Sequence, residues 1–180
     1  TPAGITVNLK GVVYTADSRN KRVQAFNSDG IFMFAVGPQI GNITLQNPVD
    51  VCVDNDRNLY ILDAGLKKVI VTEGGGKFLR VWDDSGNLKD PIGLAYDSKT
   101  YFYILDRGDF NVKIYDDQGK FVSSFFAKGM GERELKDPQS IAVADNKLFI
   151  ADYEGAKVLA FDLSYLPEAP QFDMAATAAD

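Results

Sequence analysis

The chain has 180 residues, of which 46% are hydrophobic and 12% aromatic, as is typical of a folded globular protein with one substantial core. Its net charge of -6 argues against a nucleic-acid backbone or an anionic membrane as the main partner, and we expect no transmembrane segment. The chain has no histidine and one cysteine, which excludes Ser-His-Asp and Cys-His catalysis, histidine-ligated metals and an internal disulfide.

Four copies of one pattern follow each other along the chain. Each copy opens with a proline, at Pro2, Pro48, Pro91 and Pro138. A first strand-like run follows the proline, and a second run ends in an aspartate, at Asp17, Asp63, Asp106 and Asp152. The third run starts six residues after each aspartate, at Val23, Val69, Val112 and Val158. In the first three copies a turn with Gly then leads into a fourth run. Runs rich in β-branched and aromatic residues, separated by turn residues, predict short strands.

Four strands in a repeat of roughly 40–50 residues predict the blade of an all-β propeller. We expect blades at about residues 2–37, 48–82, 91–126 and 138–162. The fourth copy has no Asp-Gly hairpin after Phe161-Asp162, so its outer strand is expected to be missing or irregular. Residues 163–180 contain Pro167 and Pro170 and end in an Ala-rich stretch, which predicts a surface tail with a frayed end.

The sequence resembles the NHL repeat family. The segments Asp17-Ser-Arg-Asn-Lys-Arg-Val-Gln-Ala-Phe26 and Phe149-Ile-Ala-Asp152 match the family pattern most closely, and the resemblance covers about residues 2–162. It implies a propeller of four-stranded blades, and complete propellers of this family usually have six. Four copies therefore leave a closed four-bladed ring, an open arc completed by other chains, or a piece of a longer protein. Because the fourth copy offers no obvious strand to close a ring, we favour a partial or open propeller.

The acidic residues are interpreted as turn formers. An aspartate that ends a strand usually accepts hydrogen bonds from the next backbone N–H groups, and its repetition in every copy favours that structural role. The segment Asp54-Asn-Asp56-Arg-Asn58 starts like a calcium loop, but the Gly, the later Glu and the flanking helices of an EF-hand are missing. We interpret it as a turn, as we do Asp83-Asp84 and Asp116-Asp117, and predict no metal site and no cofactor.

Three smaller features have plain interpretations. Cys52 occupies the slot of Thr6, Ala95 and Ala142, which predicts a small buried side chain rather than a nucleophile. The basic turns Arg19–Arg22 and Lys67-Lys68 are interpreted as solvated, with contact to an anionic partner as the alternative. Asn42-Ile-Thr44 fits a glycosylation sequon in a long loop.

The best candidate for an interaction surface is a set of aromatic residues on the fourth strands. Alternate residues of these strands would face the next blade, so the others are expected to face outward, with core packing as the alternative. The set consists of Phe32, Phe34, Phe78, Trp82, Phe121, Phe125 and Phe126.

These features predict a non-enzymatic scaffold or protein–protein interaction module, a subunit or accessory protein of a larger assembly. Other protein subunits are the expected partners, in a homo- or hetero-oligomer that completes the propeller. One alternative is a calcium-dependent enzyme similar to propeller lyases and lactonases, in which carboxylates and Asn would have to hold the metal without histidine. A second alternative is an RNA-binding NHL module, which the negative charge disfavours. Because many bacterial proteins that resemble this one are exported, we expect a periplasmic or secreted, extracytoplasmic location.

Overall fold

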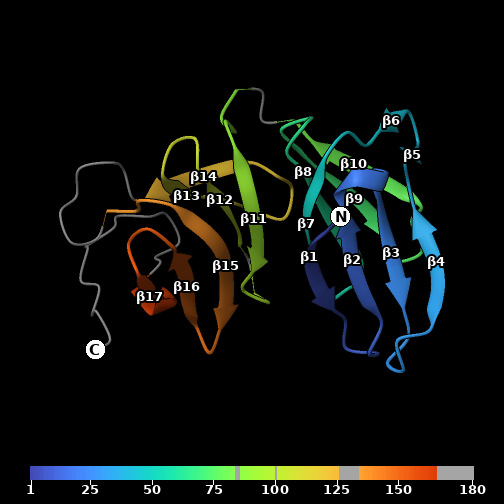
Figure 1. Cartoon of the computed structure of the whole chain (residues 1–180), viewed down its shortest axis with the longest axis horizontal. Coiled ribbons are helices and arrows are strands. Elements are labelled where there is room, and N and C mark those ends of the chain that lie inside the picture. The colour runs from blue at the N-terminus through green and yellow to red at the C-terminus, as the bar shows by residue number, and fades with distance from the viewer. Residues whose placement is uncertain (84–85, 100, 126–133, 166–180) are drawn as a thin grey trace. The chain divides into compact units, whose positions relative to one another are not determined.

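The computed structural model describes residues 1–83, 86–99, 101–125 and 134–165. These residues form four antiparallel sheets, one small hairpin and two 3-10 turns (Figure 1). The four sheets coincide with the four sequence copies, so the prediction of an all-β chain of propeller blades is confirmed. No helix in the described part of the chain is long and apolar enough to cross a membrane.

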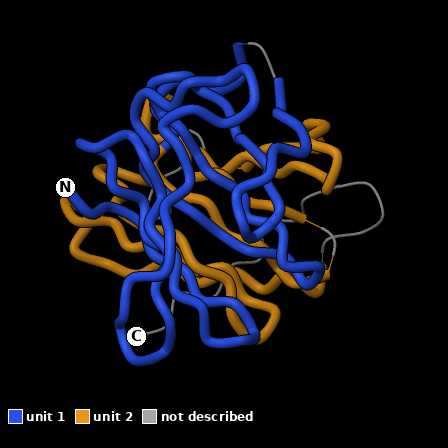
Figure 2. Tube along the Cα trace, turned by 90° about the vertical axis from the view of Figure 1, so that its right-hand side faces the viewer, with its two compact units in different colours: residues 1–91 blue, residues 92–180 orange. Residues whose placement is uncertain are grey.

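The chain divides into two compact units, residues 1–91 and 92–180, coloured separately in Figure 2. Unit 1 holds the first two blades, and in each blade neighbouring strands follow one another along the chain. The first blade consists of β1 (Pro2–Val7), β2 (Val13–Asp17), β3 (Arg22–Phe26) and β4 (Phe32–Val36). The second consists of β7 (Pro48–Val53), β8 (Asn58–Asp63), β9 (Lys68–Glu73) and β10 (Phe78–Trp82). A short turn, η1 (Ser18–Asn20), follows β2.

Unit 2 holds the third and fourth blades. The third consists of β11 (Pro91–Tyr96), β12 (Phe102–Asp106), β13 (Asn111–Tyr115) and β14 (Phe121–Phe125), with Pro91 as the last residue of unit 1. The fourth has three strands among the described residues, as the missing hairpin predicts. They are β15 (Pro138–Ala144), β16 (Lys147–Asp152) and β17 (Lys157–Asp162).

Two segments differ from the sequence interpretation. The loop between the first two blades contains a hairpin of two-residue strands, β5 (Gln39–Ile40) and β6 (Ile43–Thr44), too short to show any periodicity in the sequence. The expected tail begins with η3 (Leu163–Tyr165), where Leu163 packs in the core of unit 2 and donates its backbone N–H to Asn146 O at 2.8 Å. Residues 166–180 of that tail lie outside the described residues.

Each blade has two faces, because side chains alternate along a strand and cross-strand partners share a face. We call leading face the side that carries, in the first blade, Ile5, Val7, Val13, Thr15, Gln24, Phe26, Phe32 and Ala35. We call trailing face the side that carries Thr6, Tyr14, Ala16, Val23, Ala25, Phe34 and Val36. The same slots define the two faces of the other blades.

Within each unit the core forms where a trailing face meets a leading face. In unit 1, Tyr14 and Ala25 of the first blade belong to one apolar cluster with Leu59 and Ile61 of the second. In unit 2, Tyr103 of the third blade clusters in the same way with Ile150 of the fourth. Leucines three residues before the next proline, Leu45 and Leu135, complete these cores. Burial of these side chains is what holds the blades of a unit together.

Glycine lets the innermost strands of neighbouring blades approach closely. Gly4 and Gly93 occupy the same slot, two residues after the opening proline. A Cβ at Gly4 would lie 2.6 Å from Asp50 Cα, and one at Gly93 would lie 2.8 Å from Ile141 Cγ2. Both distances are below any real carbon contact, so a side chain at Gly4 or Gly93 would push the blades of its unit apart.

Candidate functional site

The repeated aspartates hold each blade together. Asp63 is fully buried, and its carboxylate accepts backbone hydrogen bonds from Gln46 at 2.7 Å, Asn47 at 3.0 Å and Leu66 at 3.0 Å. Asp152 accepts in the same way from the backbone N–H groups of Lys136 and Asp137. For Asp63, the bond from Leu66 confirms the predicted role in the turn that follows the strand. The bonds to the loop before the blade were not predicted.

The other two repeated aspartates bind side chains. Asp17 accepts hydrogen bonds from Asn20 Nδ2 at 2.8 Å and Arg22 Nε at 3.2 Å. These bonds, that of Asn20 above all, lower the pKa of Asp17 to about 2. Asp106 accepts from the buried Lys113 Nζ at 2.9 Å, and Lys113 also contacts Asp109 at 2.9 Å. Both carboxylates therefore bind side chains of their own blades.

The segment that starts like a calcium loop closes its own turn. Asp54 accepts hydrogen bonds from the Asn58 backbone N–H at 2.7 Å, from Asn58 Nδ2 at 2.7 Å and from Tyr60 OH at 3.0 Å. Burial raises the pKa of the Tyr60 hydroxyl, and the negative charge of Asp54 raises it further. Among the described residues, no three His, Cys, Asp or Glu side chains gather in a way that could hold a metal ion.

The other two acidic pairs also belong to turns and ion pairs. Asp116 accepts from the backbone N–H groups of Gln118 at 3.0 Å and Lys120 at 2.8 Å, as the turn interpretation predicts. Asp83 forms an ion pair with Lys68 Nζ at 3.2 Å, and Asp84 lies outside the described residues.

Cys52 lies in β7 as a buried free thiol, so its interpretation as a core side chain is confirmed. Burial, together with the negative charges of Asp50 and Asp54, raises the pKa of this thiol well above its usual range. A thiol with a raised pKa is a poor nucleophile at neutral pH.

Each basic turn contains one exposed lysine and one residue that forms an ion pair. Lys21 and Lys67 are exposed at equivalent positions, with φ values of 54° and 55°. Arg22 is engaged with Asp17 and Lys68 with Asp83. Asn42 of the sequon is exposed in the turn between β5 and β6, where a modifying enzyme can reach it.

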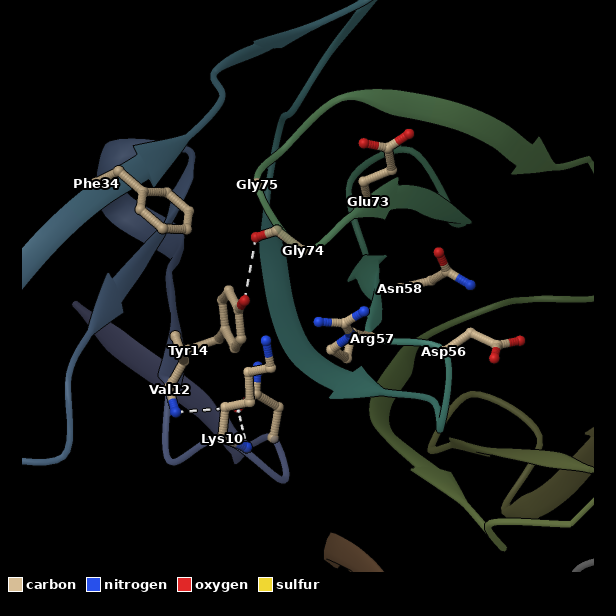
Figure 3. A pocket seen from close by; sticks show the side chains of 11 residues that line it. Lys10, Val12, Tyr14, Phe34, Asp56, Arg57, Asn58, Glu73, Gly74 and Gly75 are labelled. Carbon is tan, nitrogen blue, oxygen red and sulfur yellow. Dashed lines mark hydrogen bonds between the residues drawn. The ribbon is translucent and has the colours of Figure 1, made fainter.

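A pocket of about 450 Å³ lies in unit 1, between hairpins of the first and second blades (Figure 3). Charged side chains of both signs line it, namely Lys10, Arg57, Asp56 and Glu73. In Figure 3 Arg57 points toward Tyr14, whereas Asp56 points away.

Two of the polar side chains at this pocket, those of Tyr14 and Glu73, bind other residues of the chain. Tyr14 OH donates a hydrogen bond to Gly74 O at 3.1 Å, and burial raises its pKa. Glu73 pairs with Lys77 at 2.9 Å. The pocket can accommodate a small polar molecule, but Tyr14 is not poised to act as a base there.

The residues of the predicted aromatic surface differ in their exposure, and some of them pack in the core. Trp82 is buried, and its ring lies edge-on to that of Tyr60 with 5.5 Å between the ring centroids. Phe34 and Phe78 pack against the core of unit 1. Phe125 contacts Phe161 at 5.9 Å in unit 2. Phe32 and Phe121 are exposed, by 51% and 37%. Phe126 lies outside the described residues. The role of this set in interactions stays a prediction.

An apolar surface of which the sequence interpretation named only Phe32 lies on the leading face of the first blade. Ile5, Val7 and Phe32 are exposed by 70%, 59% and 51%. Val7 begins a cross-strand row that continues through Val13 and Phe26 to Phe32, so the apolar side chains adjoin one another. The repeat contained a signal for it, because the slots of Ile5, Val7 and Phe32 carry Val51, Val53 and Phe78 in the second blade, 46 residues later.

Comparison with protein families gives two matches. The model described as "6-bladed beta-propeller" matches residues 83–178, which is more than half of the chain. The NHL repeat model matches residues 1–26, so the resemblance inferred from the sequence is confirmed. No curated protein matches the chain.

Solved structures with a similar fold include three informative examples. A streptogramin B lyase is 16% identical at a TM-score of 0.67, over 88% of this chain and 50% of its own. Virginiamycin B lyase from Staphylococcus aureus is 14% identical at 0.67, over 88% of this chain and 51% of its own. A chain of a nidogen/laminin complex is 16% identical at 0.64, over 91% of this chain and 76% of its own. The chain spans about half the length of the lyases, and identities this low show a shared fold alone.

Proposed function

Because the chain belongs to the 6-bladed β-propeller family, we propose that it is a non-enzymatic protein-interaction module that joins other subunits in a larger assembly. Propellers support many unrelated functions, so the argument has to come from a surface of this chain rather than from the fold.

The supporting observation is the exposed apolar leading face of the first blade. Fully burying a Val, Ile or Phe side chain contributes about 1.5–3 kcal/mol, so covering Ile5, Val7 and Phe32 would stabilise a complex substantially. Contiguous exposed apolar residues of this kind mark protein–protein contacts more often than isolated ones do.

The acidic groups most suggestive of chemistry have structural partners, which favours a binding role over a catalytic one. Asp63 and Asp152 accept hydrogen bonds from backbone N–H groups, and Asp54 closes its own turn. The calcium-dependent alternative therefore has no specific observation in its favour. For location we propose the extracytoplasmic space, on the strength of the family resemblance.

Site-specific photo-crosslinking tests this function. We would place benzoylphenylalanine at Val7 on the leading face and, as the control, at Asp29, an exposed residue of the β3–β4 hairpin. After irradiation of cells that produce the protein, we expect a protein adduct of defined mass at Val7 and none at Asp29. Mass spectrometry of the adduct identifies the polypeptide. A leading face that gives no more adduct than the hairpin control would contradict the proposed function.

A further inference from the structure

The tyrosine that lines the pocket of unit 1 has a different partner from its counterparts in the repeat. Tyr60 donates its hydroxyl hydrogen bond to Asp54 of its own blade at 3.0 Å, and Tyr103 donates to the aspartate in the same slot of its blade at 3.3 Å. Tyr14 stands in the equivalent slot of the first blade. Its hydroxyl donates instead to Gly74 O of the second blade at 3.1 Å. The pocket therefore lies where the repeat pattern changes, and such departures concentrate at functional sites.

Asn8 accounts for the change of partner. It occupies the slot of Asp54, and its side-chain oxygen accepts hydrogen bonds from the backbone N–H groups of Lys10 at 2.9 Å and Val12 at 3.0 Å. An aspartate in this slot has a second carboxylate oxygen that can accept from the tyrosine, whereas a carboxamide has none. The hydroxyl of Tyr14 consequently bonds to the neighbouring blade.

The second blade meets this hydroxyl with a turn of three consecutive glycines. The turn reads Glu73-Gly74-Gly75-Gly76, whereas the corresponding turns of the first and third blades contain one glycine each. A Cβ at Gly74 would lie 2.9 Å from Arg57 O and 3.0 Å from Tyr14 OH, so a larger residue would push the turn away from the pocket. The backbone N–H groups of Gly74 and Gly75 have no acceptor among the described residues, so both are available as donors.

Two cationic side chains at the pocket are also without a partner. Neither the ammonium of Lys10 nor the guanidinium of Arg57 forms an ion pair or a hydrogen bond with another described residue. In Figure 3 Arg57 extends toward the tyrosine. The two acidic residues of the lining do not neutralise these cations, because Glu73 pairs with a lysine of its own turn at 2.9 Å and Asp56 points away. The pocket therefore offers positive charge to a ligand.

The remaining wall is aromatic and apolar. The rings of Phe34 and Tyr14 lie edge-on with 6.4 Å between their centroids, and Val12 adjoins them in the lining. A volume of about 450 Å³ is in the range of pockets that hold small molecules. An apolar wall beside two unpaired cations suits a ligand with one negative group and an apolar body.

We propose that this pocket binds a small organic acid, with its carboxylate held by Lys10 and Arg57 and its apolar body against Phe34. The planar guanidinium matches a carboxylate with two parallel hydrogen bonds. A single negative charge suits the site better than a doubly charged phosphate, because Glu73 and Asp56 remain at the rim.

This inference goes beyond the proposed function and does not depend on it. Tyr14 and Phe34 belong to the trailing face of the first blade, whereas the proposed protein contact lies on the leading face. Crosslinking at Val7 and ligand binding at the pocket can therefore each succeed or fail without the other.

Titration with phenylacetate, followed by amide NMR of the unaltered chain, tests the site. The probe has one carboxylate and one aromatic ring, and for a molecule of its size we expect a Kd of about 1 mM. The amide signals of Gly74 and Gly75 should shift and reach saturation. Phenylacetamide, which has the same shape without the charge, should leave these signals in place.

Variants that remove one charge locate the carboxylate. Lys10→Gln and Arg57→Gln should each weaken phenylacetate binding by about fivefold or more, because each loses a charge-assisted hydrogen bond. Lys67→Gln is the matched control, since Lys67 is exposed, lies outside the pocket lining and has a positive φ as Arg57 does. Amide spectra that match the unaltered chain away from the substitution show that each variant is folded.

Three results would overturn the inference. The first is the absence of a saturable shift at phenylacetate concentrations well above the expected Kd. The second is an equal affinity for phenylacetate in Arg57→Gln, Lys10→Gln and the Lys67→Gln control. The third is inorganic phosphate binding as tightly as phenylacetate, which would mean that the apolar wall contributes nothing to recognition.

Discussion

At the scale of single residues, Asp63 ties the loop before the second blade to the turn after β8. Its three backbone hydrogen bonds connect positions up to 17 residues apart in the chain. Sequence repetition correctly predicted a structural aspartate at this slot. The loop donors Gln46 and Asn47 were not predictable, because nothing in a sequence pattern shows which backbone groups a strand end will approach.

Replacing Asp63 with Ala should lower the free energy of unfolding by about 1–3 kcal/mol, because buried backbone donors then lose their acceptor. Asp63→Asn should cost less, since the amide oxygen still accepts. Urea unfolding followed by tryptophan fluorescence measures both, with Asp29→Ala as the exposed control. Equal stability of Asp63→Ala and the control would show that water replaces the lost carboxylate.

Asp17 predicts a dependence of stability on pH. Its pKa is lowered from 3.8 to about 2 in the folded chain, chiefly by the hydrogen bond from Asn20, so the folded state favours the ionised carboxylate. The stabilisation is fully present above pH 3.8 and is lost as the pH falls through about 2. The difference in Tm between the unaltered chain and Asp17→Asn should therefore shrink over this window. A difference that stays constant from pH 5 to pH 2 would contradict the assignment.

At the scale of elements, all four blades have the same left-handed residue position in the turn between their second and third strands. The residue four positions after each repeated aspartate has a positive φ, although it is Lys21, Lys67, Phe110 or Ala156 and never glycine. The strands around this turn were predictable from their apolar runs and constant spacing. The left-handed turn itself was not, because the usual signal for a positive φ is Gly or Asn.

The glycine between neighbouring blades gives an element-scale prediction. Gly93→Ala should destabilise unit 2 by about 1–3 kcal/mol, because the new Cβ would meet Ile141 Cγ2 at 2.8 Å. Gly75→Ala is the matched control, since a Cβ at Gly75 meets nothing within 4 Å. Thermal unfolding compares the two variants.

A double-mutant cycle identifies the cause of that destabilisation. Most of the cost of Gly93→Ala should disappear in an Ile141→Ala background, where the Cγ2 atom is absent. An unchanged cost in that background would place the strain somewhere other than this contact.

At the scale of the whole molecule, four blades and an all-β fold were predictable because the pattern repeats in register. The uncovered faces were not. Val158 and Val23 are the same residue in the same slot, yet one is 62% exposed and the other 1%. The repeated sequence pattern shows which residues of a blade can contact a neighbouring blade. It does not show whether that neighbour is present. For the same reason the predicted aromatic set combined buried Trp82 with exposed Phe32, since both lie on fourth strands.

The single thiol has a practical consequence for following motion in the protein. Cys52 is buried in β7, so a thiol reagent can reach it only when that strand becomes accessible. With no second cysteine to react, labelling kinetics report the opening of one defined site. When labelling is much faster than closing, the observed labelling rate equals the opening rate. At low reagent concentration, where closing is faster than labelling, the observed rate gives the equilibrium constant between the closed and open forms.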